Sequence, residues 1–279
     1  MGGNIRFMTI GSAPIAPDVL SFARAAMGLM RSFLKAISGQ TECAAVGTVT
    51  LETDMTPGHV GIPSLCCAIK LIDVPELNYY AADDVGEICI RGYNVFKGYY
   101  KNDEMTKETL DEDGWLHSGD IGKWTEHGTL KVIDRKKHIF KLQQGEYIAP
   151  EKIENVYEHS KYVMQIFVYG ESLKTCLIAI VVPEQKMLEK AAADHLGMQN
   201  PSLKELCSNE ALKKLILEDL IDIGKKGGLQ SFEQVKDIYV SQEQFTIEND
   251  MLTPTLKGKR PNIKKHFAAQ IDAMYSKLK

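Results

Sequence analysis

Four separate clusters of small, hydroxyl-bearing and charged residues in this sequence combine residue types that could carry chemistry. The first cluster spans 38–42 and reads SGQTE. A loop of small residues can turn its backbone N–H groups and the Thr41 hydroxyl toward a phosphate, while the Glu42 carboxylate holds Mg²⁺ on the same phosphate. An ordinary surface turn explains these residues about equally well, because Gly, Ser and Thr are common in turns.

The second cluster is the run 113–122, DGWLHSGDIG. Gly119 and Gly122 bracket Asp120, so a tight backbone can carry one carboxylate outward, and a carboxylate is the usual bidentate partner of a ribose diol. Three glycines within nine residues are costly in a plain connection, which favours a functional interpretation. His117 is more typical of a packed or capping histidine than of a general base, so it is left out of the chemistry.

The third cluster is a run of cations within 134–147. Four of them lie close together, namely Arg135, Lys136, Lys137 and Lys141. They could gather phosphate and sugar oxygens, and Arg135 is the best suited to planar, forked hydrogen bonding. Such a run is usually a solvated surface. Its position between two differently patterned regions favours a ligand-binding hinge, because a linker that contacts ligand can couple domain rotation to a reaction.

The fourth cluster, 252–260, reads LTPTLKGKR. Lys259 follows a glycine and could swing into a cleft, where it would place a point charge on a developing anion, and Lys257 is its close rival. The run is not a phosphate-binding P-loop, because Arg260 stands where Ser or Thr is needed and no glycine lies five residues before Gly258. A GxGxxG fingerprint is also missing, so P-loop and dehydrogenase functions are excluded.

The first cluster must be positioned by the strand and the helix that precede it in the sequence. The apolar run 5–10 predicts a buried strand. A helix is expected from Pro17, where the proline fixes φ and Asp18 lies near the positive end of the helix dipole. Phe22 and Ala26 are expected to face inward from this helix.

The next region changes to short apolar runs separated by turns. The segments 67–74 and 86–92 are each about one strand long and rich in Ile and Val, which predicts a sheet or barrel. Polar and charged residues then dominate 134–138, as is typical of a linker. We therefore predict a domain boundary there, with one domain at 1–134 and a second at 135–279.

The second region has an α+β pattern. Residues 151–160 predict an amphipathic helix, with Ile153, Val156 and Tyr157 on one face. Two strands are expected at 166–170 and 176–183, the second too apolar to have a wet face, and helical patterns follow from Leu188 to Leu220.

Composition bounds the function classes. The 279 residues carry a net charge of −4, with 44% hydrophobic and 25% charged residues, which excludes disorder, collagen and coiled coil and favours about two domains. The longest apolar run, Cys176–Val182, is far shorter than the roughly 20 residues that a membrane helix needs. The six cysteines form no CxxC pair, so neither a zinc cage nor a disulfide framework is indicated, and a reducing compartment is preferred. A strand so soon after Met1, with no secretory signal, suggests that upstream sequence is missing.

In order and approximate spacing, the four clusters resemble the late core motifs of adenylate-forming enzymes. The segments FKLQQGEYIAPEKIEN and FTIENDMLTPTLKGKRP are most similar to the long-chain fatty acyl-CoA synthetases. This resemblance implies an α/β fold in which 1–134 is the C-terminal part of the large AMP-binding domain, a parallel-sheet remnant plus a β-rich subdomain. Residues 135–279 are then the hinge and a smaller α+β C-terminal lid domain.

The resemblance also implies an ATP-dependent, two-step ligation of long-chain fatty acid to coenzyme A through an acyl-adenylate, with no nucleic-acid partner. Residues that contact the nucleotide are then Gly39, Gln40, Thr41, Asp120, Arg135 and Lys259. Among these, Thr41 contacts the α-phosphate and Asp120 with Arg135 binds the ribose. Glu42 holds Mg²⁺, and Lys259 bridges the carboxylate and the α-phosphate.

The same resemblance assigns the second half-reaction to the lid. Lys137 falls at the hinge position, while Lys141 and the Gly145 loop face the site during thioester formation. It further implies a longer, membrane-associated protein that faces the cytosol at the endoplasmic reticulum or the mitochondrial outer membrane through an N-terminal anchor.

The sequence departs from the family pattern in three respects, and the first of them favours a fragment. The phosphate loop with its lysine, and most of the fatty-acid tunnel, lie upstream in the family. Ser38 stands where the family has an aromatic residue that stacks on adenine, a loss worth roughly 1 kcal/mol, and the stretch 29–38 is about three residues longer than the family pattern. The alternatives are a non-catalytic module that binds nucleotide, CoA or a partner, and a related ligase for a shorter acid.

Overall fold

The structure is a computed structural model that describes residues 7–11, 15, 17–28, 33–51 and 53–278. The chain divides into two compact units, Met1–Ile139 (unit 1) and Phe140–Lys279 (unit 2). The division follows Ile139, whereas the composition shift predicts a boundary after Asp134. The shift begins earlier because the last strand of unit 1, β8 (Leu130–Arg135), already ends in charged residues.

The first sheet of unit 1 contains the predicted N-terminal strand. Its order is β1-β2-β3-β4, and the members are β1 (Phe7–Ile10), β2 (Phe33–Ser38), β3 (Thr48–Val49) and β4 (Ile62–Pro63). Strands β1 and β2 are parallel and are connected through α1 (Pro17–Gly28), while the other pairs are antiparallel. Residues 5 and 6 of the predicted strand lie outside the described residues. The β1-α1-β2 unit is the parallel remnant that the sequence predicts.

The inward face of α1 differs from the prediction. Leu20 and Arg24 are 1% and 4% exposed, whereas Phe22 is 74% exposed and Ala26 is half-buried. A helix turns about 100° per residue, so Phe22 lies on the side opposite to Leu20 and Arg24. The expectation that Phe22 faces inward is therefore wrong for this chain.

The second sheet of unit 1 is an antiparallel meander of order β5-β6-β7-β8. Its other strands are β5 (Cys67–Ile72), β6 (Val85–Gly92) and β7 (Leu116–Trp124), and the short helix α2 (Asp103–Thr109) connects β6 to β7. Single 3-10 turns occur at η1 (Thr41–Cys43), η2 (Pro75–Leu77), η3 (Ala81–Asp83) and η4 (Lys136–His138). The β-rich region predicted from the apolar runs is confirmed. Its core gathers Cys43, Leu71, Ile88, Ile90, Leu116 and Leu130.

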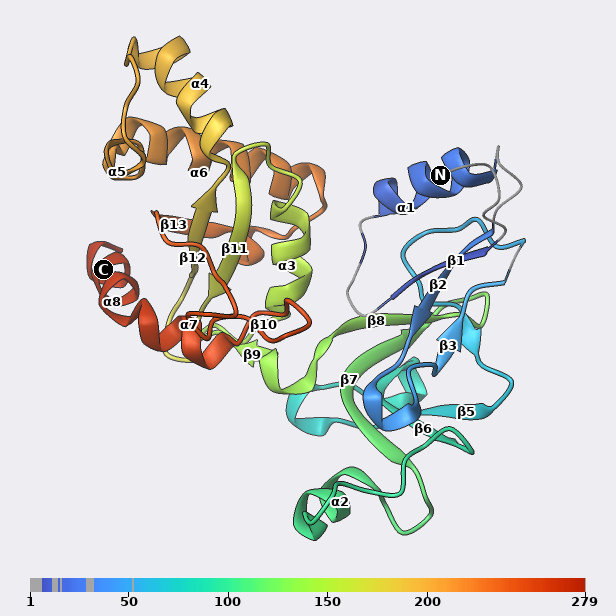
Figure 1. Cartoon of the computed structure of the whole chain (residues 1–279). Coiled ribbons are helices and arrows are strands. Elements are labelled where there is room, and N and C mark those ends of the chain that lie inside the picture. Colours follow the sequence, from blue (N-terminus) through green and yellow to red (C-terminus); the bar gives the residue numbers. More distant parts are fainter. Residues whose placement is uncertain (1–6, 12–14, 16, 29–32, 52, 279) are drawn as a thin grey trace. The chain divides into compact units, whose positions relative to one another are not determined.

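Unit 2 is built on a three-stranded sheet with helices on both faces (Figure 1). The strands are β11 (Val163–Tyr169), β12 (Leu177–Pro183) and β13 (Val235–Val240), and a small hairpin precedes them, β9 (Phe140–Lys141) with β10 (Tyr147–Ile148). The helices are α3 (Pro150–Tyr157), α4 (Gln185–Leu196), α5 (Leu203–Ser208), α6 (Glu210–Lys226), α7 (Arg260–His266) and α8 (Ala268–Lys277), with one 3-10 turn, η5 (Ser231–Glu233).

Every residue of the central strand β12 is buried. Leu177, Ala179 and Val181 join one core cluster, packed with residues of α3, α4 and α6. The alternate residues Ile178, Ile180 and Val182 join a second cluster with residues of α7 and α8. Side chains alternate across a strand, so a strand covered on both faces must be apolar throughout, as the sequence predicts.

All six cysteines are free thiols. In the part of the chain that the structure describes, every helix is too short or too polar to cross a bilayer.

Candidate functional site

The first polar cluster forms a tight turn after β2. Gly39 passes so close to the other limb that a Cβ atom there would lie 2.5 Å from the Ala45 carbonyl oxygen. The Gly47 N–H donates to the Ser38 carbonyl oxygen (2.8 Å), and the Ala45 N–H donates to that of Gln40 (3.1 Å). Space therefore requires glycine at position 39, and the predicted binding residues Gly39 and Gln40 form the neck of the turn.

Thr41 and Glu42 lie in η1 at the tip of this turn, and the two residues that follow Cys43 have an unusual backbone conformation. Ala44 and Ala45 have φ angles of 49° and 77°, so two successive residues with side chains are left-handed. That conformation costs roughly 1–2 kcal/mol per residue, and such strain concentrates at functional sites. Thr41 is exposed and Glu42 is half-buried, so a turn of fixed shape presents the hydroxyl and the carboxylate.

Asp120 of β7 and Arg135 of β8 are neighbours across the sheet. Asp120 Oδ1 lies 3.4 Å from Arg135 Nε, and the side chains are 24% and 38% exposed. The two bracketing glycines serve the backbone, because Gly119 has a φ of 69° and a Cβ at Gly122 would lie 2.7 Å from Ile88 Cγ1. The structure thus pairs the carboxylate and the guanidinium that were predicted to bind one ligand, and leaves both partly accessible.

A small pocket in unit 1 joins the first two clusters. Its polar lining comes from both clusters and from the strands beside them, and consists of Ser38, Gly39, Gln40, Gly47, Thr48, Ser118 and Asp120. Its apolar lining consists of Ile69, Ile88, Ile90 and Leu130. The fold therefore brings together the predicted residues Gly39, Gln40 and Asp120, which lie far apart in the sequence.

Thr48 and Ser118 are lining residues that the sequence analysis missed. Thr48 is 1% exposed, and its Oγ1 has no hydrogen-bond partner among the residues that the structure describes. Because buried hydroxyls are normally hydrogen-bonded, the pocket is suited to a polar ligand atom or a water at this position. Ser118 belongs to the second cluster but carried no predicted role, and no local sequence pattern marks Thr48, since a lone Thr is common in strands.

The cations of the third cluster differ in the acidic groups that they contact. Lys136 Nζ lies 3.0 Å from Glu76 Oε1 and 3.3 Å from Glu87 Oε2. Burial alone lowers the pKa of Lys136, but hydrogen bonds and charge from both carboxylates outweigh burial and raise the pKa above its ordinary value. Lys136 is therefore held within unit 1, whereas the predicted hinge residue Lys137, also in η4, is exposed.

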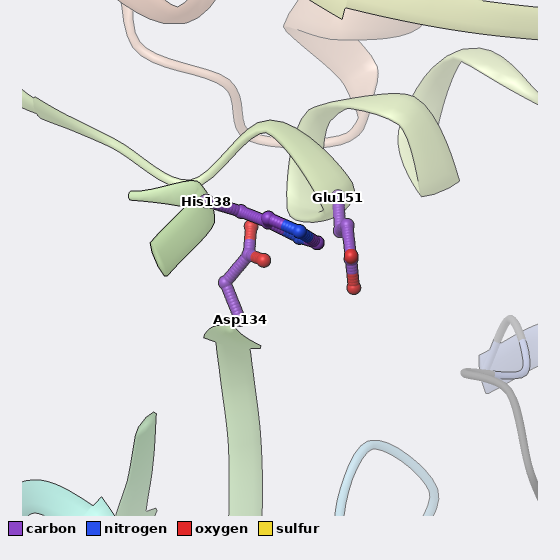
Figure 2. Close-up of side chains that lie close together, drawn as sticks. All are labelled: Asp134, His138 and Glu151. Carbon is purple, nitrogen blue, oxygen red and sulfur yellow. The ribbon is translucent and has the colours of Figure 1, made fainter. Parts of the chain in front are cut away.

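Figure 2 shows two polar residues at this turn, Asp134 near the end of β8 and His138 as the last residue of η4. The same figure draws Glu151, which belongs to the first turn of α3 in unit 2. Asp134 is 2% exposed, and its Oδ1 accepts a hydrogen bond from the Arg135 N–H at 2.6 Å. This bond fixes the backbone where the chain leaves β8 and so helps to direct the Arg135 side chain.

In unit 2, the predicted residues Lys141 and Gly145 share the β9–β10 hairpin. Gly145 has a φ of 105°, which favours glycine, and its N–H donates to the Leu142 carbonyl oxygen at 2.9 Å. Lys141 Nζ lies 5.2 Å from the centre of the Tyr147 ring. The hairpin therefore presents an exposed lysine beside a tight glycine turn, within the same unit as the fourth cluster.

Lys259 lies at the N-cap of α7, and its Nζ is paired with the Asp250 carboxylate. The hydrogen bond and the charge from Lys259 lower the pKa of Asp250 below its ordinary value. The next residue, Arg260, is instead committed to Glu154, with Nη1 at 2.7 Å from Oε1. Asp250 is a partner that the sequence analysis missed, because it lies nine positions before Lys259 in an irregular segment.

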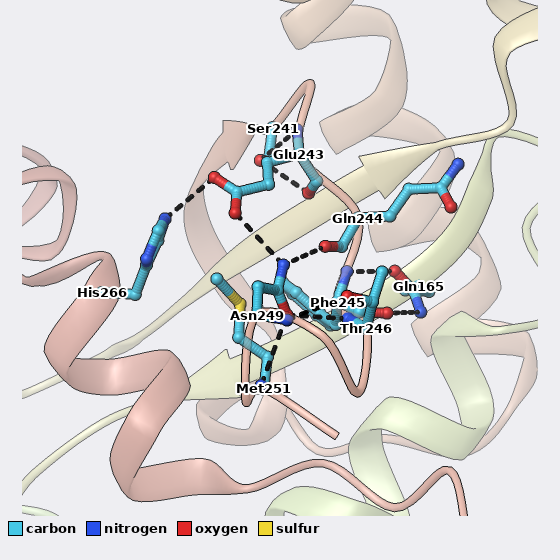
Figure 3. Close-up of polar contacts among 9 residues, drawn as sticks. All are labelled: Gln165, Ser241, Glu243, Gln244, Phe245, Thr246, Asn249, Met251 and His266. Atoms are coloured by element: carbon cyan, nitrogen blue, oxygen red, sulfur yellow. Dashed lines mark hydrogen bonds and ion pairs between the residues drawn. The ribbon is translucent and has the colours of Figure 1, made fainter. Parts of the chain in front are cut away.

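The loop that carries Asp250 is fixed to the sheet by side chains (Figure 3). Gln165 of β11 bonds both backbone groups of Phe245, donating at 3.0 Å and accepting at 2.8 Å. Asn249 Oδ1 accepts from Thr246 N–H at 2.9 Å, and its amide nitrogen donates to Glu243 Oε1 at 3.1 Å. These bonds give the loop a defined path into α7, so Lys259 starts from an ordered position.

The chain is similar in sequence to known proteins. Residues 1–100 match the family model described as AMP-binding enzyme. Over its whole length the chain is 55% identical to long-chain-fatty-acid–CoA ligase 5 of Rattus norvegicus, of which it covers 40%, and 54% identical to ligase 1 of Homo sapiens, of which it covers 39%. The chain thus spans about two fifths of the length of these curated relatives.

The chain is also similar in fold to a solved structure. The adenylation domain of the carboxylic acid reductase from Segniliparus rugosus, in complex with AMP and a co-purified carboxylic acid, is 32% identical and matches with a TM-score of 0.81. The match covers the whole chain and 40% of the solved one.

Proposed function

This chain is homologous throughout to the C-terminal portion of the long-chain-fatty-acid–CoA ligases, and from that premise we propose that it performs the corresponding part of fatty-acid activation. In the first half-reaction, the fatty acid carboxylate attacks the α-phosphate of ATP, which gives an acyl-adenylate and pyrophosphate. In the second, the CoA thiol attacks the acyl carbon and displaces AMP, which gives the thioester.

The observation that carries the proposal is the pocket shared by Gly39, Gln40 and Asp120, with Arg135 paired to Asp120 at 3.4 Å. A carboxylate can accept both hydroxyls of a ribose, and the guanidinium beside it holds that carboxylate in place and adds donors. The hydroxyl of Thr41, the residue after Gln40, is proposed to bond the α-phosphate. These groups suit AMP, which has a sugar diol and one phosphate.

Electrostatics explains why the reaction needs cations. Attack of one anion on another is repelled, and positive charge placed where negative charge develops lowers that barrier. Lys259 is proposed to bridge the attacking carboxylate and the α-phosphate. Its partner Asp250 is 69% exposed, so exchanging this ion pair for a pair with substrate costs little.

Mg²⁺ is the cation that the family implies for the phosphates, and the residues present fit it. Glu42 has one carboxylate oxygen bonded to Tyr99, while the other has no hydrogen-bond partner in the described part of the chain. One carboxylate together with substrate phosphates is a common way for proteins to bind this ion. When bound, Mg²⁺ would neutralise phosphate charge.

The second half-reaction is assigned to unit 2 and the hinge. Lys137 is proposed as the hinge residue, and Lys141 with the Gly145 turn is proposed to face the site when CoA reacts. The longer protein is proposed to act at the cytosolic face of the endoplasmic reticulum or of the mitochondrial outer membrane, which fractionation of cells that express it would test.

A chimera tests the proposal. The homologous C-terminal portion of the 55% identical rat ligase is replaced by this chain, and palmitoyl-CoA and AMP are measured with palmitate, ATP and CoA. Thioester formation above that of the rat N-terminal portion alone is expected. No thioester from a folded chimera would contradict the proposed function.

Lys259→Ala in the same chimera tests the role of the lysine. Adenylation, followed as palmitate-dependent ATP–pyrophosphate exchange, should be abolished, while thioester formation from preformed palmitoyl-adenylate should be largely retained. Lys257→Ala is the matched control and should retain both. Equal loss of the two half-reactions in Lys259→Ala would refute the assigned role.

A second candidate function is nucleotide binding or a partner interaction without catalysis. Ser38 favours it, because this residue lines the pocket where the resemblance leads one to expect an aromatic ring that stacks on adenine. Calorimetry of the chain with AMP distinguishes the candidates when combined with the chimera. Micromolar binding together with an inactive chimera would favour the non-catalytic function.

A further inference from the structure

The loop 94–99, between β6 and α2, is bonded to the turn that carries Glu42. Asn94 Nδ2 donates to the carbonyl oxygens of Cys43 (3.0 Å) and Val46 (2.7 Å). These carbonyls lie on either side of the left-handed residues 44 and 45. One side chain therefore holds both ends of the strained segment.

The same loop also holds Glu42 itself, by its backbone and by its side chain. The Phe96 N–H donates to the Glu42 carbonyl oxygen at 2.7 Å. The Tyr99 hydroxyl donates to Glu42 Oε1 at 2.8 Å. One of these two hydrogen bonds fixes the backbone of Glu42, and the other fixes the direction of one carboxylate oxygen.

The Tyr99 ring is itself held in place. Its centre lies 4.9 Å from that of Phe96, with the rings at 81°, an edge-to-face geometry that is favourable for aromatic pairs. The Tyr99 N–H donates to Thr106 Oγ1 of α2 at 2.9 Å. The hydroxyl is thus presented by a side chain anchored at both its ring and its backbone.

We propose that Tyr99 is the positioning residue of this site, orienting the Glu42 carboxylate so that its second oxygen faces a divalent cation carried on the nucleotide phosphates. This inference rests on the proposed function. A bond to one oxygen of a carboxylate removes its rotational freedom without occupying the other oxygen. Outer partners of this kind typically change metal affinity by about 10–100-fold when they are removed.

Tyr99→Phe tests the inference, because it removes the hydroxyl and keeps the ring. Tyr100→Phe is the matched control, since Tyr100 is the adjacent residue and is 87% exposed. The readout independent of turnover is the affinity of the chain for Mn²⁺ in the presence of ATP, measured from the electron paramagnetic resonance signal of free Mn²⁺. Tyr99→Phe should weaken Mn²⁺ binding about 10-fold or more, and Tyr100→Phe should leave it unchanged.

In the chimera, Tyr99→Phe should raise the Mg²⁺ concentration needed for half-maximal ATP–pyrophosphate exchange, with a smaller change in the rate at saturating Mg²⁺. A merely structural role would lower the rate at every Mg²⁺ concentration and lower the thermal midpoint. Equal Mn²⁺ affinity in both variants and the unmodified chain would overturn the inference alone. An unmodified chain without Mn²⁺ binding, in an inactive chimera, would overturn the proposed function as well.

Discussion

Gly39→Ala is expected to break the turn that shapes the pocket. A methyl group at this position would lie 2.5 Å from the Ala45 carbonyl oxygen and 2.8 Å from the Gly47 nitrogen. Both are backbone atoms. The Gly47 N–H donates to the Ser38 carbonyl oxygen at 2.8 Å, and the Ala45 N–H donates to that of Gln40 at 3.1 Å, so this limb cannot yield without losing a bond. Overpacking of this kind costs about 1–3 kcal/mol, and we expect the upper half of that range.

Gly114→Ala is the matched control, because it adds the same methyl group at a place with no atom within 4 Å. Its φ of 78° still penalises alanine, by roughly 1–2 kcal/mol. Urea unfolding measures both costs, and calorimetry with AMP measures binding. Gly39→Ala should lose AMP binding and Gly114→Ala should keep it. If Gly39→Ala were no less stable than the control and bound AMP normally, the close contact would not shape the site.

Two further predictions concern thiols and a buried ion pair. Burial raises the pKa of Cys89 to about 12, so at pH 8 the thiolate fraction of Cys89 is roughly 10⁻⁴. Iodoacetamide should therefore modify the exposed Cys66 and leave Cys89 unmodified up to about pH 10. Equal rates of modification of the two cysteines, measured by mass spectrometry of the folded chain, would contradict this prediction. Arg260→Ala leaves the Glu154 carboxylate, only 13% exposed, without its cation and should destabilise the chain by about 3 kcal/mol in urea unfolding, the lower end of the range for buried pairs. The exposed Lys265→Ala should change stability by less than about 0.5 kcal/mol.

Local sequence patterns were sufficient to predict an element when the order of apolar and polar residues within it shows which of its faces are buried. The run at β12 has no polar face, which fits only a strand covered on both sides. In α3, Ile153 and Tyr157 are both fully buried, as their spacing predicts. The prediction for Phe22 was wrong because periodicity shows that a helix has an apolar face but does not show which segment covers that face.

Local patterns predicted the residue types of the candidate site but not its pairings, and only the resemblance to a known family placed Asp120 and Arg135 on one ligand. Asp120 meets Arg135 through the register of β7 with β8, which shifts between Ile121 and Gly122, and no composition rule gives such a shift. Lys136 looked like a phosphate ligand in the sequence, but carboxylates 49 or more residues away hold it. Long-range pairing of this kind depends on the folded sheet, so a sequence pattern cannot reveal it.

The partners of the cations also decide which of them a substrate can recruit. Arg260 is bonded to Glu154, and the two side chains are only 15% and 13% exposed, so removing the cation from its partner costs several kcal/mol. Lys136 is shared by two carboxylates, one of them, Glu87, only 8% exposed. Lys259 has a single acidic partner, Asp250, which is 69% exposed, and pairs of this kind contribute about 0–1 kcal/mol. A phosphate can therefore replace Asp250 at small cost, which supports the proposed role of Lys259 as the charge that moves onto the substrate.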